Sequence, residues 1–107
     1  TSAQAIASAM IHLTKLMVEG CDGGTLHFSG TPDVSWAEFA REIMELAGLS
    51  CEINPILTKD YPTTAPRPLN SRMDDNLLYE DYGIIRPAWS PDLEQIIIEL
   101  RELSGAT

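Results

Sequence analysis

Apolar residues recur at steps of three and four positions near both ends of the chain, which is typical of helices with one apolar face. In residues 3–18 these positions are Ala3, Ile6, Ala7, Met10, Leu13 and Met17. In the last stretch they are Leu93, Ile96, Ile97, Leu100 and Leu103. We expect the first helix to end at Gly20, and the last to have Ser90 as its cap and Pro91 at its first helical position.

A further helix is predicted over residues 35–47, with both ends specified by the sequence. Ser35 and Glu38 have the spacing of a capping box, in which each side chain accepts a hydrogen bond from the other residue's backbone N–H. Gly48 supplies the left-handed residue that ends the helix. The face expected to be buried consists of Trp36, Phe39, Ala40, Ile43, Leu46 and Ala47.

Two short strands are predicted between the helices. In residues 25–30, TLHFSG, polar and apolar positions alternate, so that Leu26 and Phe28 face one way. Residues 52–57, EINPIL, form the second candidate, in which Pro55 donates no hydrogen bond and so indicates an edge or a bulge. With the helices, these strands predict the α+β fold class, as a small lobe of about four helices and two short strands.

Residues 58–73, TKDYPTTAPRPLNSRM, contain three of the seven prolines and few large aliphatic side chains. We therefore expect an ordered loop, followed by a short helix over residues 74–82 that ends at Gly83. Long ordered loops in compact domains are usually functional.

The composition limits the classes of function. The chain has 107 residues, of which 7 are basic and 16 acidic, giving a net charge of −9. A nucleic acid or an anionic membrane surface needs a positive footprint, so neither is expected as a partner. No apolar run approaches the ~20 residues that span a bilayer, and the N-terminus lacks the basic start of a signal peptide. We expect one soluble, cytoplasmic domain.

The charge balance reverses only in the proline-rich loop. Lys59, Arg67 and Arg72 stand against Asp60, which gives a local charge of +2. Arginine presents a planar fork of donors that matches phosphate oxygens, and the prolines on both sides of Arg67 restrict its backbone. Asn70 and Ser71 add neutral hydrogen-bonding groups, as a sugar or phosphate requires. The alternative is that both arginines pair with surplus carboxylates on neighbouring helices.

Catalytic and metal-binding patterns are not found. The glycines at 20, 23 and 24 follow a predicted helix rather than opening one, and none of the three tyrosines has a lysine four residues later. The cysteines (Cys21, Cys51) and histidines (His12, His27) have no metal-ligand spacing, so they are interpreted as reduced thiols and ordinary imidazoles. The carboxylate pairs Glu38/Glu42 and Asp74/Asp75 are interpreted as solvated helix surface and helix start. Trp36 and Trp89 could stack on a base or a sugar, but each stands beside a helix start, where an aromatic side chain normally packs into the core.

Nearly the whole chain resembles the C-terminal part of the dTDP-4-dehydrorhamnose reductases, a family of extended short-chain dehydrogenases/reductases of rhamnose biosynthesis. The matching segments are TSAQAIASAM, GTLHFSG, SWAEFAREIMELAG, PILTKDYPTTAPRPLNSRMDDNLLYEDYGI and PAWSPDLEQIIIEL. Within them YPTTAPRPLNSRMD is the specific part. The resemblance implies an N-terminal Rossmann domain with a glycine-rich cofactor loop and a Tyr-x-x-x-Lys pair, neither of which occurs in residues 1–107. These residues are therefore expected to be a C-terminal substrate-binding lobe.

By this resemblance, the full enzyme would transfer a hydride from NADPH or NADH to the C4 ketone of dTDP-4-dehydro-L-rhamnose, and the fragment alone would be inactive. The loop residues Arg67, Asn70, Ser71 and Arg72 would lie over the nucleotide-sugar, with Arg67 as first choice for the diphosphate. Some family members hold Mg²⁺ with glutamates at a dimer interface. Glu99 falls where one ligand could lie, but Gln4 stands where an acidic partner is expected, so no metal site is assigned.

Other interpretations and partners follow from the same resemblance. A non-catalytic regulatory homologue, such as the regulatory subunit of methionine adenosyltransferase, would use the same fold. An unrelated α+β interaction domain would leave YPTTAPRPLNSR unexplained. The expected partners are a dTDP-sugar and a second copy of the chain, through the exposed interdomain face or the dimer helices.

Overall fold

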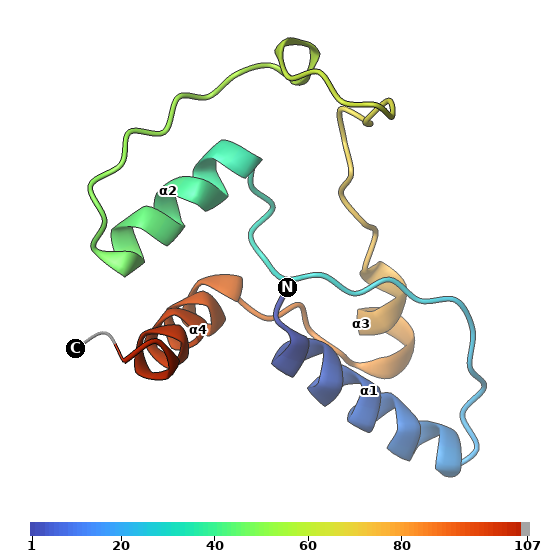
Figure 1. Ribbon diagram of the computed structural model, residues 1–107. Coiled ribbons are helices and arrows are strands. Elements are labelled where there is room, and N and C mark those ends of the chain that lie inside the picture. The colour runs from blue at the N-terminus through green and yellow to red at the C-terminus, as the bar shows by residue number, and fades with distance from the viewer. Residues whose placement is uncertain (106–107) are drawn as a thin grey trace. The chain divides into compact units, whose positions relative to one another are not determined.

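The computed structural model describes residues 1–105, which form four α-helices and one short 3-10 helix (Figure 1). These elements are α1 (Ala3–Val18), α2 (Trp36–Ala47), η1 (Thr58–Asp60), α3 (Asn76–Tyr82) and α4 (Trp89–Leu103). The chain divides into two compact units. Unit 1 holds Thr1–Asp33 and Met73–Leu93, and unit 2 holds Val34–Arg72 and the chain from Glu94 onward. None of the helices is long and apolar enough to cross a membrane.

The prediction of two strands is wrong. Residues 25–30 and 52–57 are extended but unpaired, and the described part of the chain has only an isolated parallel bridge, between Thr31 and Ala88. An extended segment becomes a strand only when a neighbouring segment accepts and donates its backbone hydrogen bonds. Neither segment has such a neighbour in residues 1–105, so the fold is α-rich.

In unit 1, a serine caps the start of α1 and a glycine ends α3. The Ser2 hydroxyl oxygen accepts from the Ala5 N–H (3.0 Å) at the start of α1 and donates to the Asp92 carboxylate. Gly83 ends α3 with a φ of 67°, a left-handed conformation that favours glycine. The predicted boundaries of both helices are thereby confirmed to within two residues.

The start of α4 lies earlier than predicted. Ser90 was expected to cap the helix and Pro91 to be its first residue, but α4 begins at Trp89 and includes both. The backbone N–H of Trp89 donates to Thr31 O (3.1 Å), and its indole Nε1 donates to Pro32 O (2.8 Å). These bonds fix Trp89 at the start of the helix, which sequence signals at Ser90 could not reveal.

The predicted capping box of α2 is confirmed in unit 2. The Ser35 N–H donates to Glu38 Oε2 (2.7 Å), and the Glu38 N–H donates to Ser35 Oγ (3.2 Å). Gly48 has a φ of 64° at the other end, as the sequence predicts. Arg101 of α4 donates to Ala47 O, so the last carbonyl of α2 also has a side-chain donor.

The buried face of α1 differs from the prediction. Of the six positions expected to be buried, only Leu13 is half-buried, and Met10 is 62% exposed. The inward positions are Ala9, which is buried, and Ala5, Leu13 and Leu16, which are half-buried. Apolar residues occur on two sides of this helix, so spacing alone does not decide which side packs.

The expected faces of α2 and α4 are confirmed only in part. Trp36 is 79% exposed rather than buried, although its ring lies edge-on to Phe39 at 6.3 Å between centroids. The other five positions of the α2 face are half-buried. In α4 Ile97 is buried and Leu93 half-buried, whereas Ile96, Leu100 and Leu103 are exposed. Trp89 is half-buried, closer to its predicted place in the core.

Candidate functional site

Residues 58–72 of unit 2, which we call the arginine loop, hold the four predicted site residues. The loop begins with η1 and then runs without further helix or strand. Every residue from 54 to 74 is exposed. The loop is ordered by local hydrogen bonds such as that from Thr63 Oγ1 to Ala65 O (2.7 Å). The side chains of the loop therefore face solvent and do not form a core.

The positive charge of the loop is not cancelled by ion pairing within the described chain. Lys59, Arg67 and Arg72 outnumber Asp60, so the loop carries +2. In residues 1–105 neither Arg67 nor Arg72 makes an ion pair with a carboxylate within 4.0 Å. Pairing with surplus carboxylates on neighbouring helices was the alternative interpretation, and the described residues of unit 2 contain no such pair.

The structure joins two of the predicted residues directly. Asn70 Oδ1 accepts hydrogen bonds from both the backbone N–H and the Nε–H of Arg72, each at 3.0 Å. Arg67 lies between two prolines, and Ser71 lies between the bonded pair with an exposed side chain. No hydrogen bond joins Arg67 or Ser71 to the pair in the described residues. Arg72 is therefore the arginine whose side chain is already held.

Unit 1 contains a partly buried polar cluster that the sequence did not predict. We call Ser29, Asp33, Asp75 and Arg86 the Arg86 cluster. Arg86 Nε lies 3.0 Å from Asp75 Oδ2, and Arg86 Nη2 lies 2.5 Å from Asp33 Oδ1. Ser29 Oγ donates to Asp75 Oδ2 (2.6 Å). Ser29 and Asp75 are 46 residues apart along the chain and Asp33 and Arg86 are 53 apart, so no local spacing signals these two pairs.

Asp75 corrects the interpretation of the Asp74/Asp75 pair as solvated. The Asp75 side chain is only 4% exposed, and its Oδ1 atom is buried without a hydrogen-bond partner in the described chain. It precedes α3 but does not cap it with its side chain. Asp75 and Arg86 line an open hollow of about 520 Å³ together with Thr31, Met73, Asp74, Asn76, Tyr79, Ile84 and Ile85.

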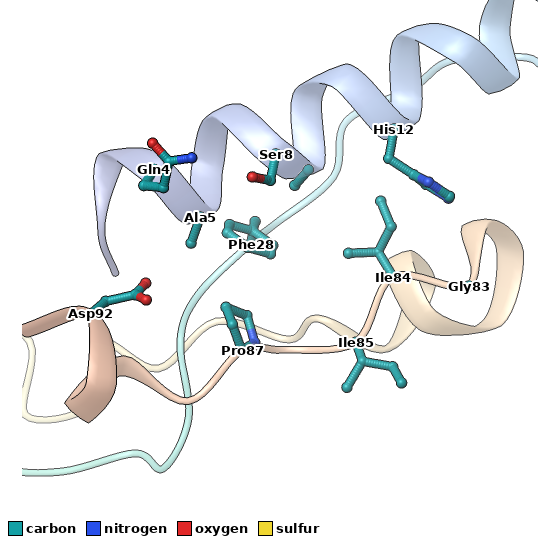
Figure 2. Close-up of a pocket in the computed structure, with 11 residues that line it drawn as sticks. Gln4, Ala5, Ser8, His12, Phe28, Gly83, Ile84, Ile85, Pro87 and Asp92 are labelled. Carbon is teal, nitrogen blue, oxygen red and sulfur yellow. The ribbon is translucent and has the colours of Figure 1, made fainter. Parts of the chain in front are cut away.

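A second hollow in unit 1, of about 410 Å³, lies between α1 and residues 83–87 (Figure 2). Gln4, Ser8 and His12 line it from α1, and Asp92 lies at one end. Ser8 and His12 are one helical turn apart, but His12 Nε2 lies 3.3 Å from Tyr82 O and is not bonded to Ser8. A nucleophile needs a base within hydrogen-bond reach, so this hollow does not contain such a pair.

Tyr82, beside this hollow, is not a proton acceptor. Its hydroxyl donates to Asp22 O (2.7 Å). Partial burial raises the pKa of Tyr82, and the nearby Cys21, Asp81 and Asp22 raise it further. The phenol therefore stays protonated at neutral pH.

No group of three or more histidine, cysteine or acidic side chains within residues 1–105 is arranged to hold a metal ion. Glu99 is exposed, and its Oε1 accepts from Gln95 Nε2 (2.9 Å). Cys21 and Cys51 are exposed free thiols.

Residues 1–102 match a family model described as the RmlD substrate binding domain. A dTDP-4-dehydrorhamnose reductase of Sinorhizobium fredii is 31% identical over 104 residues, which cover 91% of this chain and 35% of the relative. The reductase of Aggregatibacter actinomycetemcomitans is 34% identical over 102 residues, covering 85% of this chain and 34% of the relative.

A spore coat polysaccharide biosynthesis protein, SpsK, of Bacillus subtilis is 34% identical over 76 residues, covering 71% of this chain and 26% of that protein. No solved structure matches the chain. The chain spans about a third of the length of the curated reductases it matches.

Proposed function

This chain belongs to the RmlD substrate binding domain family, and we propose that it forms the substrate-binding part of a dTDP-4-dehydrorhamnose reductase. The proposed whole enzyme transfers a hydride from NADPH or NADH to the C4 ketone of dTDP-4-dehydro-L-rhamnose and forms dTDP-L-rhamnose. The match over residues 1–102 and the names of the relatives support this proposal. Those names favour a reductase over a non-catalytic homologue such as the methionine adenosyltransferase regulatory subunit.

The arginine loop carries the proposal as the binding site for the nucleotide diphosphate. A diphosphate is a compact anion, and an arginine fork can bind it through two parallel hydrogen bonds. The loop is exposed, has a charge of +2, and has two arginines without carboxylate partners in the described chain. We assign Arg67 and Arg72 to the diphosphate, and Asn70 and Ser71 to its immediate surroundings.

Hydride transfer is assigned to the remainder of the proposed enzyme, because the residues present here do not fit NAD(P)H. A dinucleotide site needs glycines that open a helix, whereas Gly20, Gly23 and Gly24 follow the end of α1. The chain also has no tyrosine with a lysine four residues later. Its own contribution is to bind and orient the nucleotide end of the substrate.

Self-association of the isolated chain is part of the proposal. Unit 1 has apolar side chains on its surface, among them Ile6, Met10 and Met17 of α1, which are 42%, 62% and 52% exposed. Burial of these side chains against a second copy would remove apolar surface from water. Light scattering over a range of concentrations tests this, and a strictly monomeric species at all of them would contradict it.

Titration of dTDP into the chain, followed by NMR at low salt, tests the arginine loop. We expect selective shifts of the Arg67 and Arg72 side-chain signals, with affinity falling as salt rises. Arg67→Ala should weaken binding about tenfold, which is typical of removing one charged hydrogen-bond donor. Arg41→Ala is the matched control, because Arg41 is exposed on α2 in the same unit but outside the loop.

Equal weakening by both variants would mean that dTDP senses only net charge, and would contradict a site in the loop. The reductase itself is tested on the full-length protein with NADPH and dTDP-4-dehydro-L-rhamnose. Absence of turnover there would refute the proposed reaction.

A further inference from the structure

We infer that Asn70 is a positioning residue for Arg72. This inference rests on the proposed function of the arginine loop. Its side-chain oxygen orients the Arg72 guanidinium before the ligand arrives. In this arrangement Arg72 rather than Arg67 is the pre-oriented donor, and Asn70 affects dTDP binding through Arg72.

The two hydrogen bonds at Asn70 Oδ1 have different roles. A side-chain carbonyl oxygen has two lone pairs, and Arg72 occupies both, one with its backbone N–H and one with its Nε–H, each at 3.0 Å. The backbone bond closes a local turn of the loop. The Nε bond fixes the guanidinium relative to that turn, so the side chain and its own backbone are held by the same atom.

This arrangement selects the edge of the guanidinium that can bind an oxyanion. Arginine has five N–H donors in one plane, and a bidentate contact uses either the Nε edge or the edge formed by the two Nη atoms. Because Nε–H is engaged by Asn70, the edge with both Nη atoms remains for a phosphate group. Arg72 is exposed, so this edge is not covered by the core.

The two arginines of the loop are therefore restricted at different levels. Pro66 and Pro68 restrict the backbone around Arg67, but its side chain has no hydrogen bond in the described residues. Arg72 is restricted at its side chain by Asn70. Since a long side chain loses rotamer freedom on binding, the side chain that is already held loses less.

The test combines an NMR signal of the free protein with a double-mutant cycle for dTDP binding. In the unliganded chain, Asn70→Ala should shift the Arg72 Nε–Hε signal and speed its exchange with water. The same variant should weaken dTDP binding about fivefold, which is within the range for one typical hydrogen bond. Asn54→Ala, which removes another exposed asparagine of unit 2, should change neither quantity.

The background variant Arg72→Ala separates positioning from a merely structural role. It removes the guanidinium but keeps the backbone N–H that donates to Asn70 Oδ1. If Asn70 acts by orienting the guanidinium, adding Asn70→Ala to Arg72→Ala should cause no further loss of affinity. In the Arg67→Ala background, Asn70→Ala should keep its full fivefold effect.

Three results would overturn the inference. A further loss on adding Asn70→Ala to Arg72→Ala would mean that Asn70 shapes the loop or contacts the ligand through its own Nδ2. An unchanged Arg72 Nε signal in Asn70→Ala would mean that the bond does not orient the guanidinium. Absence of any dTDP binding would overturn both the inference and the proposed loop site. If dTDP binds but the losses of affinity from Asn70→Ala and Arg72→Ala add, the inference alone is overturned.

Discussion

Leu78 allows the stability of unit 1 to be tested with an internal control. It is 2% exposed, the most deeply buried of the core side chains, and its neighbour Leu77 in the same helix is 54% exposed. Substituting each by alanine deletes the same atoms from the same helix, so differences in helix propensity cancel. The two substitutions differ only in how much of the original leucine side chain was buried away from water.

The expected magnitudes follow from these exposures. At about 0.8 kcal/mol per buried carbon, Leu78→Ala loses about 2.4 kcal/mol of transfer free energy, and Leu77→Ala loses about half of that. At Leu78 the cavity left by the truncated side chain destabilises the fold further, whereas truncation of the exposed Leu77 leaves no cavity. We therefore expect Leu78→Ala to lower the free energy of unfolding by about 2 kcal/mol more than Leu77→Ala.

Urea unfolding followed by circular dichroism at the helical minimum measures this difference, provided that both variants show the same dependence on urea concentration. A difference below about 0.5 kcal/mol, within the usual scatter of surface substitutions, would refute the burial of Leu78 in the core of unit 1.

Two further predictions concern a helix cap and a close backbone approach. Hydrogen bonds from the backbone and side chain of Ser35 lower the pKa of Glu38. The ionised Glu38 therefore stabilises the folded chain fully above its ordinary pKa of about 4.3. This stabilisation is lost as the pH falls through the lower pKa of the folded state. Exchange of the Ser35 N–H, taken relative to its intrinsic rate at each pH, should speed up over that range in the wild type but not in Glu38→Gln. Identical pH dependences of this relative rate in the two proteins would contradict the capping box. Gly30→Ala should destabilise the chain by about 1 to 3 kcal/mol, because a Cβ there lies 3.1 Å from Trp89 Cβ. Gly24→Ala should be nearly neutral, because a Cβ at Gly24 meets open space. Equal melting temperatures of the Gly30→Ala and Gly24→Ala variants would refute the close approach of Trp89 to Gly30.

Local signals explain the part of the fold that could be predicted. The Ser35 and Glu38 capping box, Gly48 and Gly83 each act within one turn of a helix, and each is confirmed. Faces and strands depend on distant partners. The α1 helix has apolar residues on two sides, and residues 25–30 lack a paired neighbour, so sequence spacing misjudged both.

The candidate site shows the same division. The charge reversal and the prolines around Arg67 are visible in the sequence, and so is the short spacing of Asn70 and Arg72. That Asn70 bonds to Arg72 rather than standing free for a ligand required the structure. The Arg86 cluster could not be predicted, because Ser29 and Asp33 lie 46 and 53 residues from their partners, and no local pattern pairs Asp75 with Arg86.

The Arg86 cluster also constrains how this sequence can vary. Loss of Arg86 alone would leave the nearly buried Asp75 carboxylate without its cation, which is costlier than the pair itself is stabilising. Loss of Asp75 alone would leave the guanidinium paired with Asp33 (2.5 Å), so the two single losses are not equivalent. Substitution of Arg86 is therefore expected to be tolerated only when Asp75 is replaced as well by an apolar residue of similar volume. A route from this pair to an apolar pair is thus less costly when Asp75 changes first.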